Sequence, residues 1–191
     1  MNIFYLDKSP VECAKMHNDK HTIKMILEYC QLLSTAHRVL DGVQTVGLSE
    51  SGRKKTVYHI VNDNRNDILY SATHINHPSA VWVRKSAKNY MHLVCILVHL
   101  CKEYTYRYGK VHKCESTGLV DRLEVPPVNI SFTEPFTEPT PAMPDEVKIA
   151  GDSISSYRNY YIKNKQHLAS WQGKINSRNV PEWFTCQHIS S

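Results

Sequence analysis

Two basic, tyrosine-rich segments contain the residue types that could bind an anionic ligand. One runs from Glu103 to Lys113 and the other from Tyr157 to Lys165. Arginine and lysine pair with phosphate, and tyrosine offers a stacking face for a base and a hydroxyl donor. Two such helices in one small protein predict a shared anion-binding cleft, with these expected ligand contacts: Tyr104, Arg107, Lys110, His112, Tyr157, Arg158 and Tyr161. The alternative is a solvated basic helix end that balances its own macrodipole.

Glu28 is the candidate catalytic acid or base. Apolar residues recur at helical spacing from about Lys20 to Leu40, which leaves one polar stripe made of His21, Lys24, Glu28, Gln31, Thr35 and Arg38. A lone carboxylate between apolar flanks can acquire a raised pKa and serve as a general acid or base. We therefore expect Glu28 and His21 to be catalytic and Lys24 to contact the ligand. The structural alternative is an ion pair between Glu28 and Lys24 within the helix.

His74 and His77 flank a turn that leads into a long helix. Zinc commonly takes three or four His, Cys or carboxylate ligands, and this turn supplies only two, so we expect neither a metal nor a cofactor. His77, Pro78 and Ser79 are instead predicted to cap the helix, with free backbone N–H groups directed at an anion. His74, His77 and Arg84 are therefore further expected ligand contacts. A purely structural turn is the alternative.

Length and composition favour one globular domain without a membrane span. With 191 residues, 41% hydrophobic and 21% charged, the chain is long enough for one buried core. Its longest apolar run, Val94 to Leu100, is far shorter than the roughly 20 residues of a transmembrane helix. The first residues show no secretory signal, and six cysteines without a C-x-x-C pair indicate free, buried thiols, so we expect a cytoplasmic protein. A formal charge of +5 favours anionic partners and does not decide whether the chain forms a homo-oligomer.

The expected fold is mostly α: a compact single-domain helical bundle over residues 1–191, with a central buried helix. Residues 3–6 could form a short strand or an extended segment. Helices are predicted at residues 10–17, 20–40, 79–109 and 145–170, with a loop at 41–56 and a short helix within 57–73. A capping box from Ser9 to Glu12 starts the first helix, and Gly42 is expected to end the second in a left-handed conformation. Residues 125–144, which hold most prolines, are predicted to be an ordered crossing loop, and the aromatic tail at 181–184 should dock onto the body.

Several motifs are spread along nearly the whole chain. They are Asp19-Lys20-His21, Lys24-Met25-Ile26-Leu27-Glu28, Leu32-Leu33-Ser34-Thr35-Ala36-His37-Arg38, His77-Pro78-Ser79 with Trp82 and Arg84, Glu103 to Lys113, Ala142-Met143-Pro144-Asp145 and Pro181-Glu182-Trp183-Phe184. Together they resemble a family of small tailed-bacteriophage proteins that has no assigned function. This resemblance implies a protein of the host-cell cytoplasm and names no activity.

A second resemblance is to the pyrimidine dimer DNA glycosylases. The residues that carry it are Asp19, His21 and Glu28 on an early helix, Arg107 and Gly109 near the end of a central helix, and the aromatic tail. Those enzymes are compact and helical, and they excise bases with an N-terminal amine and a helix carboxylate. In those enzymes, removal of the first methionine leaves a small second residue as the N-terminus. The second residue here, Asn2, is larger and hinders that removal. What the resemblance implies for this chain is therefore direct hydrolysis assisted by Glu28.

Three functions fit these features. The first is a glycosylase-like hydrolase or lyase that recognises a phosphate-bearing nucleotide or DNA, with Glu28 as acid or base and Arg107 and Arg158 on phosphates. The second is a non-catalytic protein that sequesters a nucleotide signal of host defence. The third is a virion or host-protein interaction module with the aromatic tail as its contact surface. Glu28→Gln distinguishes the first two, because only an enzyme has product formation to lose.

Overall fold

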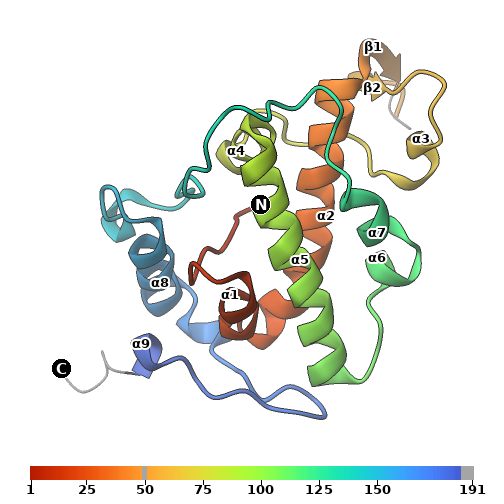
Figure 1. The fold of residues 1–191 in the computed structure, drawn as a ribbon. Helices are drawn as coiled ribbons and strands as arrows, with labels where there is room; N and C mark the ends of the chain where they lie inside the picture. Colours follow the sequence, from red (N-terminus) through yellow and green to blue (C-terminus); the bar gives the residue numbers. More distant parts are fainter. Residues whose placement is uncertain (49–50, 186–191) are drawn as a thin grey trace.

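Two long helices form the centre of the protein in this computed structural model, which describes residues 1–48 and 51–185. These helices, α2 (Asp19–Asp41) and α5 (Ala87–Tyr108), pack against each other (Figure 1). Shorter helices surround them: α1 (Pro10–Met16), α3 (Arg65–Ile68), α4 (Pro78–Lys85), α6 (Lys113–Ser116), α7 (Leu119–Leu123), α8 (Ser153–Asn164) and α9 (Glu182–Thr185). The remaining elements are an antiparallel hairpin of β1 (Val43–Leu48) and β2 (Lys54–His59) and the 3-10 helices η1 (Asp145–Val147) and η2 (Gln166–Leu168). The predicted mostly helical bundle with a central buried helix is confirmed.

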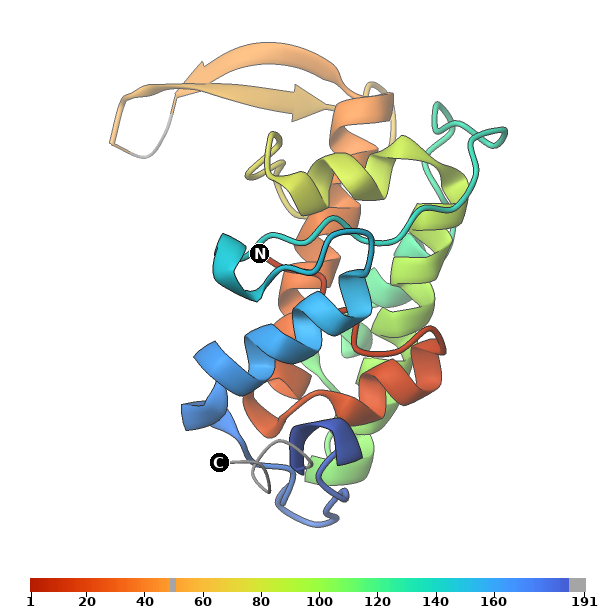
Figure 2. The same cartoon turned by 90° about the vertical axis from the view of Figure 1, so that its left-hand side faces the viewer.

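The first residues of the chain lie in the interior. Residues 3–6 are buried and extended, and they do not form the strand that the sequence left open. The Phe4 backbone N–H donates to the Tyr29 hydroxyl of α2 at 3.1 Å. Figure 2 shows the amino terminus near the middle of one face, with α8 and η1 on the same side. This course of the chain brings Met1 to α2.

The first two predicted helices form where expected, and their ends show why. Ser9 caps α1 by accepting from the Glu12 N–H at 3.5 Å, and the Asn18 side chain caps α2. Gly42 ends α2, but with a φ of −94° rather than in the predicted left-handed conformation. Glycine is needed there for space, because a Cβ would overlap the Arg38 carbonyl oxygen.

The other two long predicted helices are shorter than expected. The helix predicted at 79–109 is divided into α4 and α5 by Ser86, which is extended at φ −149° and ψ 153°. Ser86 caps α5 by accepting from the Asn89 N–H at 3.1 Å, a local signal that continuous apolar periodicity conceals. The helix predicted at 145–170 is confined to α8, because Gly151 is left-handed with a φ of 75° and Asp152 caps the helix that follows.

The prediction of a loop at residues 41–56 is wrong for most of that segment. It contains β1 and the start of β2, which pair from Val43↔His59 to Leu48↔Lys54. The β-branched residues of both strands favour this structure, but the Gly, Ser and Lys content between them obscured the signal. The short helix expected within residues 57–73 is α3.

The Pro-rich segment at residues 125–144 is an ordered crossing loop without helix or strand, as predicted. Asn89 of α5 holds it through Thr137, accepting from the Thr137 N–H at 2.9 Å and donating to the Thr137 hydroxyl at 3.1 Å. The aromatic tail also docks as expected, with the Trp183 ring 5.9 Å from the ring of Tyr161.

The cysteines that the structure describes are free thiols, as predicted. Four of them are buried and one is exposed, namely Cys13, Cys30, Cys101 and Cys114 in the interior and Cys95 on the surface. Cys186 lies outside the described residues. Among the described helices, none combines the length and apolar character needed to cross a membrane.

Candidate functional site

Glu28 lies between two cationic groups beside α2. One of its carboxylate oxygens is 3.0 Å from the Lys24 Nζ, and the other is 3.9 Å from the Met1 amino group. The side chains of Met1 and Glu28 are 7% and 13% exposed, whereas that of Lys24 is 67% exposed. A largely shielded carboxylate therefore lies between the amino group of half-buried Met1 and a solvent-exposed lysine. The intrahelical pair of Glu28 with Lys24, the structural alternative from the sequence, is present.

His77 adds an imidazole to this group. Burial lowers the pKa of His77, the Met1 amino group and His74 lower it further, and Glu28 acts in the opposite direction. The His77 Nδ1 accepts from the Ser79 N–H at 3.2 Å and so caps α4, as predicted. Because Nδ1 accepts, a neutral His77 carries its proton on Nε2. We refer to Met1, Lys24, Glu28, His74 and His77 as the amino-terminal cluster.

The turn that carries the two histidines is fixed by two helices. Thr35 of α2 accepts from the Thr73 N–H at 3.2 Å, and Arg84 of α4 donates to the Ile75 carbonyl at 2.6 Å. Arg84, an expected ligand contact, thus supports the turn. His74 has a φ of 47°, in the left-handed region that residues other than glycine seldom adopt. Such strain persists only where the surroundings impose it, and it is concentrated at ligand-binding and catalytic sites.

A pocket of about 480 Å³ opens beside the cluster. Pro78, Val81, Trp82 and Thr137 are among the residues that line it. Pro78 belongs to the first turn of α4, from which the Ser79 hydroxyl donates to the Met1 carbonyl at 3.2 Å. The pocket runs along α4 from Pro78 to Lys85, and its Pro78 end directly follows His77 of the cluster. Small-molecule sites commonly measure roughly 300–1,000 Å³, so a nucleoside-sized group fits this space.

Arg107 does not line a cleft. It is fully buried and donates to Glu103 at 2.7 Å, to Asp19 at 3.0 Å, and to the carbonyls of Lys15 and His17 at 2.8 and 2.9 Å. Every guanidinium nitrogen already donates within the protein, so Arg107 is not available to a phosphate. The predicted cleft shared by the two basic segments is corrected on this point, because Arg107 ties α5 to the start of α2.

His21, Tyr157 and Tyr161 are also core residues, which corrects their prediction as catalytic or ligand-binding groups. Burial lowers the pKa of His21 to about 3, and its Nδ1 is 2.6 Å from the Tyr161 hydroxyl. The His21 ring stacks on Phe4 with 4.3 Å between ring centroids. Tyr157 donates to the Thr140 carbonyl at 3.1 Å. These side chains hold the N-terminal segment between α2 and α8 and present no face to a ligand.

The remaining predicted contacts lie in other parts of the protein. The Arg158 guanidinium lies 5.4 Å from the centre of the Trp183 ring. The rings of Tyr104 and His112 are 5.2 Å apart, and His112 caps α6. Lys110 is exposed after the end of α5. None of these contacts includes a member of the amino-terminal cluster, so the structure does not join the two sets of predicted residues.

Only part of the polar stripe predicted on α2 is exposed to solvent. Thr35 and Arg38 are buried because the histidine turn and the base of the hairpin cover them. In the second turn of α2, Lys24 remains exposed beside Ile23, which is 41% exposed. The ligand-accessible part of the stripe is therefore the short stretch around Lys24 and Glu28.

Met1 is the member of the cluster that was absent from the expected contacts. Its approach to Glu28 depends on the course of the buried residues 3–6, which no local spacing encodes.

Within the residues that the structure describes, no three His, Cys, Asp or Glu side chains are grouped so as to hold a metal ion. Comparisons with protein-family models, curated proteins and solved structures found no match to this chain. The function is therefore argued from the cluster itself.

Proposed function

We propose that the amino-terminal cluster binds a phosphate-bearing nucleotide or DNA and hydrolyses an N-glycosidic bond in it. The observation that carries this proposal is the place of Glu28, which is 13% exposed between the Met1 amino group and Lys24. Cleavage of a glycosidic bond passes through a sugar with cationic character, and the attacking water needs a base. A carboxylate beside the sugar serves both needs.

In the proposed reaction, Glu28 takes a proton from a water molecule as the water oxygen bonds to C1′ of the sugar. The bond from C1′ to the base nitrogen breaks, and the base leaves with the electron pair and a proton. The base takes this proton from solvent, while a neutral His77 can donate a hydrogen bond to the departing base from Nε2. Lys24, exposed to solvent, is suited to a charge-assisted contact with phosphate. The pocket beside α4 accommodates the base or the sugar.

Glu28→Gln tests this proposal, because it preserves the shape of the side chain and removes its charge. The parent protein and the variant are incubated with nucleoside monophosphates, unmodified duplex DNA and ultraviolet-irradiated duplex DNA, and released bases are separated by chromatography. General acid–base catalysis contributes roughly 100-fold or more, so we expect at least that loss of product formation. Affinity for the substrate, measured by equilibrium binding, should change little.

Glu124→Gln is the matched control, since Glu124 is an exposed carboxylate at the end of α7. It should release bases at the parent rate. Base release by Glu28→Gln at that same rate would contradict the role of Glu28. Binding by the parent without any product would identify a protein that sequesters a nucleotide, and binding of none of the three substrates would contradict the whole proposal.

A further inference from the structure

The β1–β2 hairpin projects from the body as a two-stranded arm (Figures 1 and 2). Its strands pair from Val43↔His59 to Leu48↔Lys54, and most of its residues are exposed. An isolated two-stranded hairpin is only marginally stable in water. This one leaves Val46 74% exposed and Leu48 67% exposed. The described part of the chain leaves these side chains uncovered, which suits an arm that meets a partner.

The base of the arm is firmly attached to the body. Arg38 of α2 donates to the carbonyls of Tyr58, Leu69 and Tyr70 at 3.4, 2.9 and 3.2 Å. These bonds join the second strand of the hairpin to α2 and to the segment that follows α3. A partner held by the arm is therefore held at a set place relative to α2, the helix that also carries Glu28.

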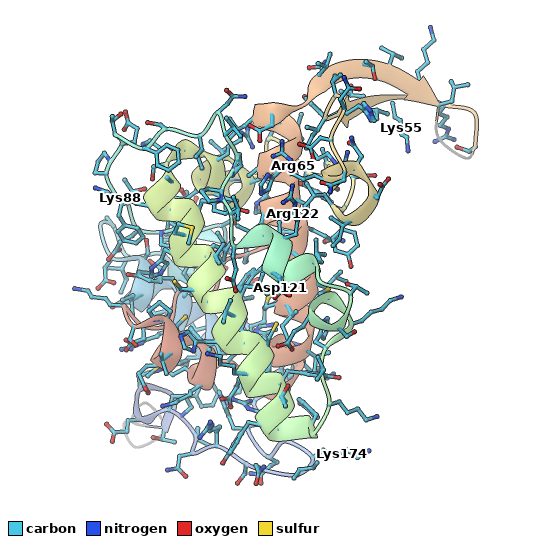
Figure 3. The ribbon with its side chains drawn as sticks, turned by 45° about the vertical axis from the view of Figure 1, so that its right-hand side comes forward. Lys55, Arg65, Lys88, Asp121, Arg122 and Lys174 are labelled. Atoms are coloured by element: carbon cyan, nitrogen blue, oxygen red, sulfur yellow. The ribbon has the colours of Figure 1, made fainter. Side chains whose placement is uncertain are left out.

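The arm is basic toward its outer end. Arg53, Lys54 and Lys55 are consecutive, and the sequence from Val43 to His59 holds one acidic residue, Glu50, against these three cations. Successive residues of a strand point to opposite faces, so Lys54 and Lys55 provide one cation on each face. Figure 3 shows Lys55 on this arm. The strands also carry side chains that can hydrogen-bond to the edges of bases, namely Gln44, Thr45 and Thr56.

We propose that the hairpin is an arm that binds duplex DNA, with its lysines on the phosphate backbone and its ribbon in the major groove. This groove is about 12 Å wide and admits a two-stranded ribbon, and strands of this length extend about 20 Å. The phosphates supply the counter-charge for the cations, and the groove covers the exposed Val46 and Leu48. The inference rests on the proposed function and deepens it, because it names DNA rather than a free nucleotide as the substrate.

The positions of the arm and the cluster allow one duplex to reach both. Asp41, the last residue of α2, lies 13 residues beyond Glu28, or about 20 Å along the helix. This separation equals about six base pairs of B-form DNA. At the base of the arm lies a pocket of about 180 Å³ lined by Lys55, Arg38 and Ser71, among others. Ser71 comes three residues before His74 of the cluster, so the segment that follows this pocket leads directly to the histidine turn.

Lys54→Ala combined with Lys55→Ala tests the arm without altering the cluster or the core. Affinity for a duplex of about 20 base pairs is measured by fluorescence anisotropy over a series of salt concentrations. Each lost phosphate contact reduces the slope of log K against log salt by about 0.9, so the double variant should lose about 1.8. At 0.1 M salt this corresponds to roughly 60-fold weaker binding. Lys54→Arg with Lys55→Arg should retain the parent slope.

Lys88→Ala combined with Lys174→Ala is the matched control. It removes the same charge from two exposed lysines away from the arm, one on α5 and one near the C-terminal tail (Figure 3). We expect this control to bind DNA with the parent's salt dependence. If the hairpin variant binds as the control does, the inference is overturned, and the chemistry proposed at Glu28 is unaffected.

Two other results overturn the inference and one separates it from the proposed hydrolysis. If the parent binds nucleoside monophosphates but no duplex, DNA is not the partner and the cluster remains a nucleotide site. If the hairpin variant dissociates a parent dimer in light scattering and keeps its DNA affinity, the partner is a second copy of the chain. Hairpin-dependent DNA binding without base release supports the arm and contradicts the hydrolysis.

Discussion

The amino-terminal cluster and the network around Arg107 contain similar residue types but differ in how fully their charges are paired. In the Arg107 network, Glu103 accepts from Arg107 at 2.7 Å and from Arg178 at 2.9 and 3.0 Å. Asp19 accepts from Arg107 at 3.0 Å and from the Ser170 hydroxyl at 2.6 Å. In the cluster, by contrast, Glu28 has an exposed lysine at 3.0 Å and an amino group at 3.9 Å.

This difference separates a structural charge network from a candidate site. Removing one partner of a buried, hydrogen-bonded ion pair leaves an uncompensated charge in the interior, so such a pair is held in place. An exposed ion pair contributes little to stability, and its members can exchange partners for a ligand. Burial and pairing, rather than the number of cationic side chains, therefore decide which of the two regions can bind.

Arg107→Ala should have the largest effect on stability. Because it leaves Glu103 and Asp19 without their buried partner, we expect the free energy of unfolding to fall by about 3–5 kcal/mol, as measured by urea denaturation. Arg122→Ala is the control. The Arg122 side chain is 39% exposed and lies 3.9 Å from Asp63 (Figure 3), so its loss should cost less than about 1 kcal/mol.

The opposite result for Arg107→Ala, normal stability with weakened binding, would contradict the contrast between the Arg107 network and the amino-terminal cluster. An Arg107→Ala protein as stable as the Arg122→Ala protein, yet with weakened binding of nucleotides or DNA, would mean that Arg107 is a ligand contact. The two basic segments would then form the shared cleft that their composition predicts.

Lowering the pH should reduce the free energy of unfolding, because buried histidines stay neutral in the folded protein. Burial lowers the pKa of His17 to about 4 and that of His21 to about 3, against 6.5 in the unfolded chain. Between pH 6.5 and 4 the unfolded chain therefore binds protons that the folded protein does not, and stability falls as the pH falls. Each histidine contributes about 0.7 kcal/mol per pH unit to this slope at pH 6.5 and about 1.4 kcal/mol per pH unit near pH 5. Urea denaturation at a series of pH values between 7 and 5 measures it.

His17→Gln isolates one of these two contributions. Near pH 5 the variant should lose about 1.4 kcal/mol per pH unit from the slope, whatever its stability at pH 7. His167→Gln, a change at an exposed position, should keep the parent slope. An unchanged slope in His17→Gln would show that His17 takes up its proton equally in the folded and unfolded protein, and the contrast between neutral buried histidines and the charged cluster would weaken.

The local parts of the fold were predictable from the sequence, and the long-range parts were not. Ser9 and Asn18 cap the first two helices through contacts within three residues, and such signals can be read along the chain. The hairpin was missed because its Gly, Ser and Lys content obscured the strand pattern, and the break at Ser86 was missed because apolar periodicity concealed a local cap that a distant contact reinforces. Ser86, for example, donates to the Pro135 carbonyl at 3.3 Å, a contact across 49 residues.

The candidate site was predicted only in part for the same reason. The cap at His77 and the pair of Lys24 with Glu28 are local, and both are observed. The approach of Met1 to Glu28 requires the whole N-terminal segment to lie between helices. The burial of Arg107 depends on backbone carbonyls about 90 residues away in the chain, which a pattern of basic residues does not reveal.

Lys24→Ala should have the smallest effect on stability and a clear effect on binding. The Lys24 side chain is 67% exposed, so loss of its pair with Glu28 should change the free energy of unfolding by no more than about 0.5 kcal/mol. If Lys24 contacts a phosphate, its removal should weaken ligand binding by roughly 10-fold or more and reduce the salt slope by about 0.9. Lys20→Ala, at an exposed lysine one turn earlier on α2, is the control and should leave both unchanged. Equal binding by the two variants would show that Lys24 only pairs with Glu28, and the cluster would then be, like the Arg107 network, a structural arrangement of charges.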